Sequence, residues 1–141
     1  MSIDLRRGGE QAFTLKLNMP VREIYCNPAV HENQGRVAIA RGPLIYCLEQ
    51  AGNTAPIRSA RIAEEPDYSV QRGEEPLRGI GTIEFDGEAS CIDYAESPLY
   101  SDTPYRTKPH RFTAIPYYAW ANREPGDMSV WIAKTHKHTE D

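Results

Sequence analysis

The sequence predicts an all-β fold, an antiparallel β-sandwich of jelly-roll-like form with little or no helix. Eleven prolines and ten glycines interrupt the chain of 141 residues, and no apolar pattern of helical period runs for three turns. Short runs alternate between apolar and polar side chains instead, as expected of strands with one buried face. Short strands separated by turn residues favour an antiparallel sandwich.

Four strands are expected in the first third of the chain. Residues 13–17 alternate Phe, Leu and Leu with Thr and Lys, which predicts a strand with one buried face. Residues 21–25 form a second short strand. Residues 36–40 and 44–49 form two more, joined around Gly42-Pro43. The last of these contains the run LIYCL, which is apolar on both faces and is therefore expected in the middle of a sheet with cover on both sides.

The middle of the chain is richer in turn residues. Residues 51–79 are expected to be mostly loop with short edge strands. Residues 80–85 alternate again and lead to Asp86-Gly87, a turn dipeptide, after which residues 89–94 form a short strand. Residues 97–109 contain three prolines and two tyrosines, and we expect them to form an extended, ordered surface connection.

The C-terminal region predicts a hairpin. Its first strand reads TAIPYYAWANR, residues 113–123, and its second reads MSVWI, residues 128–132. Between them, Pro125-Gly126 suits a reversal of the chain, because proline presets φ near −65° and glycine accepts a positive φ. We expect a register in which Arg123 pairs with Met128.

In that register the two faces of the hairpin differ, and Trp120 lies opposite Trp131. The apolar face is expected to join the core: Ala119, Ala121, Val130 and Ile132. The other face is aromatic, and with the adjacent arginine it supplies the candidate contact residues: Tyr118, Trp120, Asn122, Arg123 and Trp131. Such a face is typical of a docking surface between domains, and aromatic rings also stack on sugars. The residue types are the same in both interpretations, so both remain open.

Length and charge narrow the class of protein. The chain suits one domain, with the β-sandwich in residues 11–133, a disordered or vector-derived stretch in residues 1–10 and a frayed polar tail in residues 134–141. A net charge of −4 and a pI near 5.6 argue against nucleic acid as a partner. No apolar run approaches the roughly 20 residues that cross a membrane, and the N-terminus has no signal-like segment.

The cysteines and the other reactive side chains predict no chemistry of the chain's own. Cys26, Cys47 and Cys91 fit neither a disulfide scaffold nor a metal clip, and small partly buried thiols of this kind suit a reducing, cytoplasmic location. A glycosidase needs two carboxyl groups at a set separation. The acidic residues with strand-like spacing are expected to be a solvated turn instead: Glu84, Asp86 and Glu88. No nucleophile elbow lies near any of the four histidines: His31, His110, His136 and His138. No metal or cofactor site is predicted in this chain.

Two blocks of sequence carry a resemblance to a known family. The first is LNMPVREIYCNPAVHENQGRVAIARGPLIYCLE, residues 17–49, and the second is residues 108–132, which include TAIPYYAWANR. Together they resemble the two ends of the C-terminal β-domain of glycoside hydrolase family 127, the β-L-arabinofuranosidase-like family. The residues between the blocks are similar only in their turn-rich, extended character.

The resemblance implies a parent protein with a catalytic α/α barrel followed by β-sandwich domains. In that family a zinc-bound cysteine attacks the sugar and glutamates assist, and all of these residues lie in the barrel. This sequence has no adjacent cysteine pair of the kind that the family uses for zinc, so no catalytic residue is carried across. We therefore expect a non-catalytic accessory domain, inactive alone, that packs on the catalytic α/α barrel or on a second subunit of a homodimer. The alternative is a carbohydrate-binding module for arabinose-containing glycans.

Overall fold

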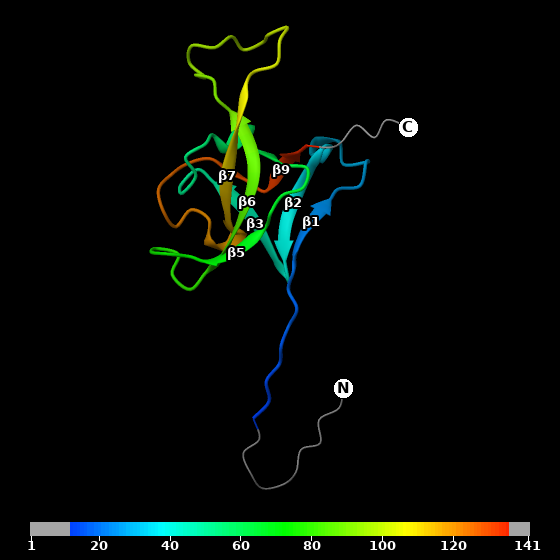
Figure 1. The fold of residues 1–141 in the computed structure, drawn as a ribbon, viewed down its shortest axis with the longest axis vertical. Coiled ribbons are helices and arrows are strands. Elements are labelled where there is room, and N and C mark those ends of the chain that lie inside the picture. Colours follow the sequence, from blue (N-terminus) through cyan, green and yellow to red (C-terminus); the bar gives the residue numbers. More distant parts are fainter. Residues whose placement is uncertain (1–11, 136–141) are drawn as a thin grey trace.

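The computed structural model describes residues 12–135, which fold as one sheet with almost no helix (Figure 1). Three 3-10 helices have three residues each: η1 His31–Asn33, η2 Ile57–Ser59 and η3 Tyr117–Ala119. The strands within the described residues are β1 Val21–Tyr25, β2 Arg36–Arg41, β3 Leu44–Glu49, β4 Arg61–Ile62, β5 Ser69–Arg72, β6 Gly81–Ser90, β7 Thr107–Pro116, β8 Met128–Ser129 and β9 Trp131–Lys134.

Six of the strands close into a barrel, in the order β2, β9, β4, β6, β7, β3 and back to β2. The other three extend it: β1 pairs with β2, β5 with β6, and β8 with β3. The pairing of β4 with β9 is parallel, and the remaining pairings are antiparallel. The all-β prediction is confirmed. The jelly-roll-like sandwich is not confirmed, because the strand pairing closes a single sheet on itself.

Strand β2 makes the closure possible because two strands, β9 and β3, pair with the same edge of it. One edge pairs with β1 over five residues. The other edge pairs first with β9, over residues 36–38, and then with β3, over residues 39–41. From Val37 to Arg41 each residue of β2 thus has a paired neighbour on both sides, and Arg36 pairs with β9 alone. This pairing satisfies most of the backbone of a strand that is almost wholly buried.

The core lies on both faces of β3. Tyr46 and Leu48 face the larger cluster, where the rings of Phe85 and Phe112 stack at 5.7 Å between centroids. Cys47, with the opposite orientation, belongs to a smaller cluster under the C-terminal loop. Full burial of each large apolar side chain contributes about 1.5–3 kcal/mol. The prediction that this strand lies mid-sheet with cover on both sides is confirmed.

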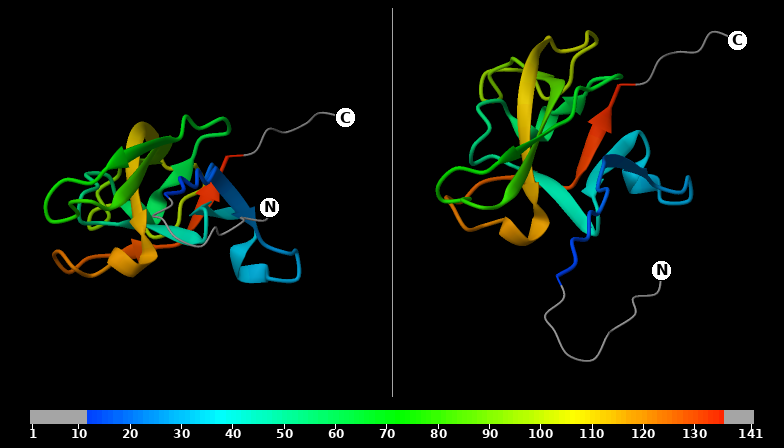
Figure 2. Two further views of the ribbon diagram at one scale, coloured as in Figure 1. Left: turned by 90° about the horizontal axis from the view of Figure 1, so that it is seen from below. Right: turned by 60° about the horizontal axis from the view of Figure 1, so that its bottom comes forward.

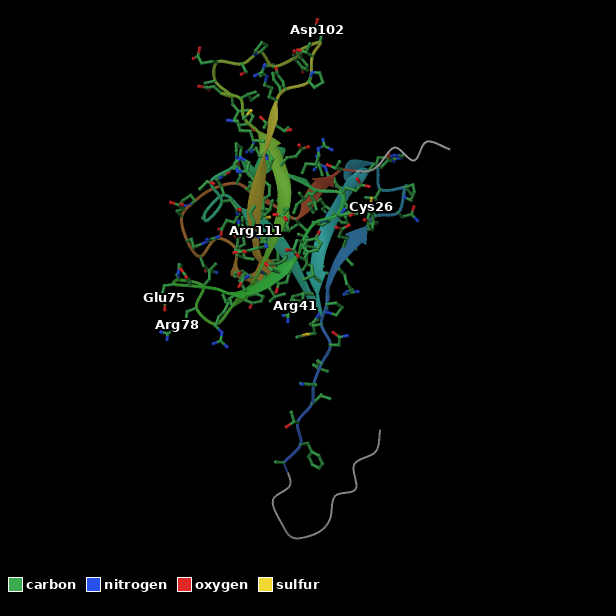
Figure 3. All side chains as sticks on the ribbon, in the orientation of Figure 1. Cys26, Arg41, Glu75, Arg78, Asp102 and Arg111 are labelled. Carbon is green, nitrogen blue, oxygen red and sulfur yellow. The ribbon has the colours of Figure 1, made fainter. Side chains whose placement is uncertain are left out.

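The turn predicted at Asp86-Gly87 and the short strand predicted at residues 89–94 are both different in the structure. Asp86-Gly87 is no turn, because β6 continues through it for ten residues and pairs with β7 along most of its length. The chain reverses only beyond β6, through a protruding loop of residues 91–106 that we call the arm; Asp102 marks its tip (Figure 3). Residues 51–79 contain only short elements, as expected.

The ends of the described chain also depart from the expectations. Residues 12–20 form no strand and lie outside the barrel, so the strand expected at residues 13–17 is wrong for this structure. At the other end the chain is ordered beyond the expected start of the tail, because Lys134 is the buried last residue of β9. The expectations for residues 1–10 and 136–141 lie outside the described residues.

The strand register gives the barrel two distinct ends. Val21 pairs with Arg41, and Tyr46 pairs with Pro116, so β1 begins where β2 and β7 finish and where β3 begins. We call this the Val21 end. Ser90 pairs with Thr107 at the opposite end, from which the arm projects (Figure 1).

Candidate interdomain surface

The predicted C-terminal hairpin does not form. Strand β7 stops at Pro116, and the chain then makes the 3-10 turn η3 and a loop. Strand β8 pairs with β3, and β9 pairs with β2 and β4. The partner of Trp131 is Ala38, not Trp120. The aromatic face is therefore divided between two parts of the barrel, and the predicted register is wrong.

Three aromatic side chains nevertheless gather at the Val21 end, and we call them the aromatic corner: Tyr117, Tyr118 and Trp120. All three are exposed, and the rings of Tyr117 and Trp120 stack with centroids 6.2 Å apart. Buried Ala119 anchors the turn in the smaller core cluster. Because η3 follows Pro116 directly, this turn lies at the end of the barrel from which the N-terminal segment also leaves (Figure 2). Of the predicted contact residues, Tyr118 and Trp120 belong to this surface.

Arg123 has a structural role in the loop that follows. Its Nε and one terminal nitrogen donate hydrogen bonds of 3.0 and 2.5 Å to Oε2 of Glu49, whose side chain is 1% exposed. The other carboxylate oxygen accepts a bond from the backbone N–H of Ala121, at 3.1 Å. Ala121 has φ of 63°, a region that non-glycine residues rarely adopt. The ion pair thus holds a strained loop against β3.

The other two predicted contact residues differ in exposure, since Asn122 is exposed and Trp131 is not. Asn122 donates its side-chain amide to the carbonyl oxygen of Ala119, 3.1 Å away, and so closes the turn. Trp131 is half-buried on β9. A pocket of about 300 Å³ beside Trp120 is lined by the same loop, and two of its three charged residues, Glu49 and Arg123, bind each other. The hydrogen-bonding groups of Glu49 and Arg123 are therefore largely occupied within the domain.

The arm carries a second set of exposed apolar side chains, at the opposite end of the barrel. Leu99 and Tyr100 are 88% and 91% exposed. The arm has internal order, since the hydroxyl of Tyr105 donates to the carbonyl of Pro98 and the backbone N–H of Ser97 donates to the carbonyl of Asp93. The sequence predicted an ordered connection here but not its exposed apolar side chains. The signal for them was the adjacent pair Leu99-Tyr100 between turn residues.

The three acidic residues on β6 form ion pairs across the sheet. Arg111 on β7 reaches Glu84 at 3.3 Å and Asp86 at 2.9 Å, and these bonds, with that to Asp86 the stronger, raise the pKa of the arginine. Glu88 accepts a 2.7 Å hydrogen bond from Thr107. The solvated turn expected at these residues is wrong, because β6 runs through all three of them. They are a surface ladder with neighbouring partners and not a pair of carboxyl groups facing a substrate.

The chain's own residues do not fit the zinc site that the family resemblance implies for a parent enzyme. Cys26 follows β1, Cys47 lies in β3 and Cys91 follows β6, and each is a free thiol. Burial raises the pKa of Cys47 to about 11, which disfavours the thiolate that binds zinc. Within residues 12–135 no three His, Cys, Asp or Glu side chains are placed to share a metal ion. His136 and His138 lie outside the described residues.

Among the described residues, no helix has the length and apolar character to cross a membrane. His31 contacts Gln34 within the short η1 segment. His110 is half-buried on β7, with its ring 6.1 Å from that of Phe112. The surface features that call for an explanation are therefore apolar: the aromatic corner, the arm and the N-terminal segment.

Comparison with known proteins identifies relatives of known activity. Over 129 residues the chain is 34% identical to the non-reducing end β-L-arabinofuranosidase of Bifidobacterium longum subsp. longum, a match that covers 88% of this chain and 20% of that protein. The crystal structure of a β-L-arabinofuranosidase from Geobacillus stearothermophilus T6 superposes with a TM-score of 0.76 at 34% identity, over 84% of this chain and 19% of that one.

A third relative, described as a family 127 β-arabinofuranosidase, gives a TM-score of 0.72 at 37% identity and covers 84% of this chain and 18% of its own. The chain thus spans about a fifth of the length of each of these relatives. None of the three is described as a carbohydrate-binding module. The model of the glycoside hydrolase family 127 C-terminal domain matches residues 21–133. The chain therefore belongs to glycoside hydrolase family 127, and most of it is that family's C-terminal domain.

Proposed function

We propose that this chain is a non-catalytic accessory domain of a β-L-arabinofuranosidase-like glycosidase and that its Val21 end packs on the catalytic α/α barrel of the parent protein. The aromatic corner carries the proposal. Tyr117 and Trp120 present stacked rings to solvent, and Tyr118 is exposed on the same turn, which is fixed by buried Ala119. A fixed cluster of exposed aromatic side chains is typical of a surface that a partner covers.

The chemistry of the described residues supports a supporting role. The acidic ladder of β6 is neutralised by Arg111 and bonded to Thr107, and the buried carboxylate of Glu49 is bound by Arg123. A glycosidase needs one carboxyl group that protonates the leaving group and a second placed across the scissile bond. Neither the ladder nor the buried pair offers that arrangement. Any zinc-dependent step would belong to the catalytic barrel of the parent protein.

The interface predicts a particular pattern of hydrogen exchange in the parent protein. Amides of residues 117–123 should exchange more slowly in the parent than in the 141-residue chain alone, because a covering domain excludes water and suppresses opening. Mass spectrometry of both proteins under the same conditions measures the difference. Residues 97–103 of the arm serve as an internal reference at the opposite end of the barrel.

A matched pair of variants separates docking from general destabilisation. Tyr118→Lys in the parent should remove the protection of residues 117–123, because it places a charge in a desolvated interface. Tyr100→Lys makes the same change on the arm and should leave that protection intact. Equal exchange of residues 117–123 in the parent and the isolated chain would refute the docking proposal. Hydrolysis of an aryl β-L-arabinofuranoside by the purified chain would refute the non-catalytic role.

A further inference from the structure

Residues 12–20 form an exposed segment with an alternating apolar pattern beside the barrel. Phe13, Leu15 and Leu17 are 60%, 74% and 67% exposed, and they alternate with Thr14 and Lys16. The segment extends away from the barrel at the Val21 end (Figures 1 and 3). Strict alternation of this kind places the three apolar side chains on one face when the backbone is extended.

The backbone of this segment has no neighbour of its own. Residues 13–18 belong to no strand pairing, and no backbone hydrogen bond joins them to another described residue. The segment has the pattern of a half-buried strand, but both its edges and its apolar face are open. Such a segment is stable as a strand only when another sheet supplies its backbone hydrogen bonds and covers its apolar face.

The C-terminal end of the segment, at Met19 and Pro20, is held against the barrel. The side chain of Met19 lies against Gly42 in the turn between β2 and β3, so closely that a Cβ there would come within 2.7 Å of its sulfur. Pro20 follows and has no N–H to donate to a ladder. Strand β1 then begins at Val21 and pairs with β2. The segment thus leaves the barrel from an anchored point and does not fold back along β1.

Similarity to a longer relative reaches into this segment. The match to the Bifidobacterium protein covers 88% of the chain and so omits about 17 of its 141 residues. That is fewer than the 20 residues that precede Val21. Some of them are therefore shared with a protein about five times as long, although the family's C-terminal domain model begins at residue 21.

We propose that residues 13–18 are a β-strand of the neighbouring domain's sheet in the parent protein, with Phe13, Leu15 and Leu17 in that domain's core. The inference rests on the proposed function, since it needs a domain packed at the Val21 end, and it specifies how the two domains are joined. The occupant is an open sheet edge of the same polypeptide. Main-chain hydrogen bonds supply the affinity, and the three apolar side chains fix the register. Thr14 and Lys16 face outward.

Hydrogen exchange tests the strand in the full-length parent. The amides of residues 13–18 should exchange at least about 100-fold more slowly in the parent than in the 141-residue chain, where nothing pairs with them. Leu15→Lys in the parent should abolish this protection, because the charge enters the neighbouring core. Thr14→Lys puts the same side chain on the outward face and should leave the protection within about threefold of the wild type.

The outcomes separate this inference from the proposed function. Rapid exchange of residues 13–18 in the parent, with residues 117–123 still protected, overturns the strand and leaves the docking surface standing. Rapid exchange of both segments overturns both. Protection of residues 13–18 in the isolated chain that increases with concentration, together with a dimer in sedimentation, also overturns the inference, because the occupant is then a second copy.

Discussion

Arg123 donates two hydrogen bonds to one oxygen of the Glu49 carboxylate, a group that is almost completely withdrawn from water. The second oxygen accepts the N–H of Ala121. A single buried carboxylate on β3 therefore holds the loop that connects the aromatic corner to β8. Sequence reasoning placed Arg123 on an outward face, where it was available to a sugar or a partner. The structure makes it the internal partner that allows Glu49 to be buried.

Removal of Arg123 is expected to cost much more stability than removal of an exposed arginine. Arg123→Ala leaves the Glu49 charge buried without its partner, and breaking a buried pair in this way costs about 3–5 kcal/mol. Arg58→Ala is the control. It removes a pair with Asp127 in which both side chains are well exposed, and solvent screens such pairs so that they contribute little to stability. Urea denaturation gives both free energies of unfolding, and similar values for the two variants would contradict this account.

Glu23 on β1 is the centre of a second polar cluster. Its Oε1 accepts hydrogen bonds from Lys134 at 2.7 Å and from Tyr68 at 2.8 Å, and its Oε2 accepts one from Tyr25 at 2.6 Å. Burial alone would raise the pKa of Glu23, but these bonds offset the effect and hold the pKa below its ordinary value of 4.5. The bond to Glu23 also raises the pKa of Tyr25 to about 12.

The lowered pKa of Glu23 predicts an acid-dependent loss of stability. The folded carboxylate binds its proton less readily than the unfolded one, so its contribution is complete above about pH 4.5 and is lost as the pH falls through the folded pKa. The free energy of unfolding of Glu23→Gln should be lower at pH 7 and should decline less steeply below pH 4.5. Denaturant titrations across this range test it. Glu96→Gln on the exposed arm should retain the wild-type slope, and an unchanged slope in Glu23→Gln would exclude Glu23 as its source.

The three thiols are expected to react at very different rates. Cys47 is fully buried, and burial raises its pKa to about 11, so thiolate is scarce at neutral pH. Cys91 is exposed and Cys26 is half-buried. Iodoacetamide at pH 8 should therefore label Cys91 first, Cys26 next and Cys47 only in denaturant, as followed by mass spectrometry. Labelling of Cys47 at the rate of Cys91 in the folded chain would show that the barrel opens readily around β3.

Local patterns predicted strands well where the partner was also local. Strands β1, β2 and β3 lie within a residue of the expected bounds, and Gly42-Pro43 is the turn between the second and the third. Each pairs with its sequence neighbour, so alternation and turn residues together determine the arrangement. The apolar character of both faces of β3 correctly indicated its central position.

The same reasoning failed where distant segments compete for a strand edge. Nothing near Trp131 in the sequence shows that β2 offers its N-terminal half to β9. The turn residues Pro125-Gly126 were compatible with a hairpin, but in the structure the residues after them pair with β2, β3 and β4 instead. Residues 13–17 were expected to pair and did not, because their pattern carries no information on where the neighbouring strand lies. Two members of the aromatic corner, Tyr118 and Trp120, were thus predicted as contact residues, but the location of the corner on the barrel was not.

Gly87 shows how the same residue type has two meanings in a sequence. After Asp86 it was taken as a turn residue, yet it lies inside β6 and pairs with His110. A Cβ at this position would collide with the backbone carbonyl of Arg61 in β4, and it would lie 3.1 Å from the ring of Phe112. Glycine is needed here because two strands and a core ring converge on it.

We therefore expect Gly87→Ala to destabilise the barrel even though alanine suits a strand better than glycine. The neighbour that must move is backbone on β4 and cannot rotate away, so the cost should fall in the range of about 1–3 kcal/mol that overpacking brings.

Gly35→Ala is a demanding control. Its Cβ would meet nothing within 4 Å, but its φ of 70° strains any other residue, at a cost of about 1–2 kcal/mol. Phe112→Leu should relieve part of the Gly87→Ala penalty and none of the Gly35→Ala penalty, because only the first involves the ring. Thermal and urea unfolding of the single and double variants measure this coupling. If Phe112→Leu gave the same change in both backgrounds, the ring would make no contribution to the Gly87→Ala penalty. A Gly87→Ala variant as stable as the wild type would refute the steric account itself.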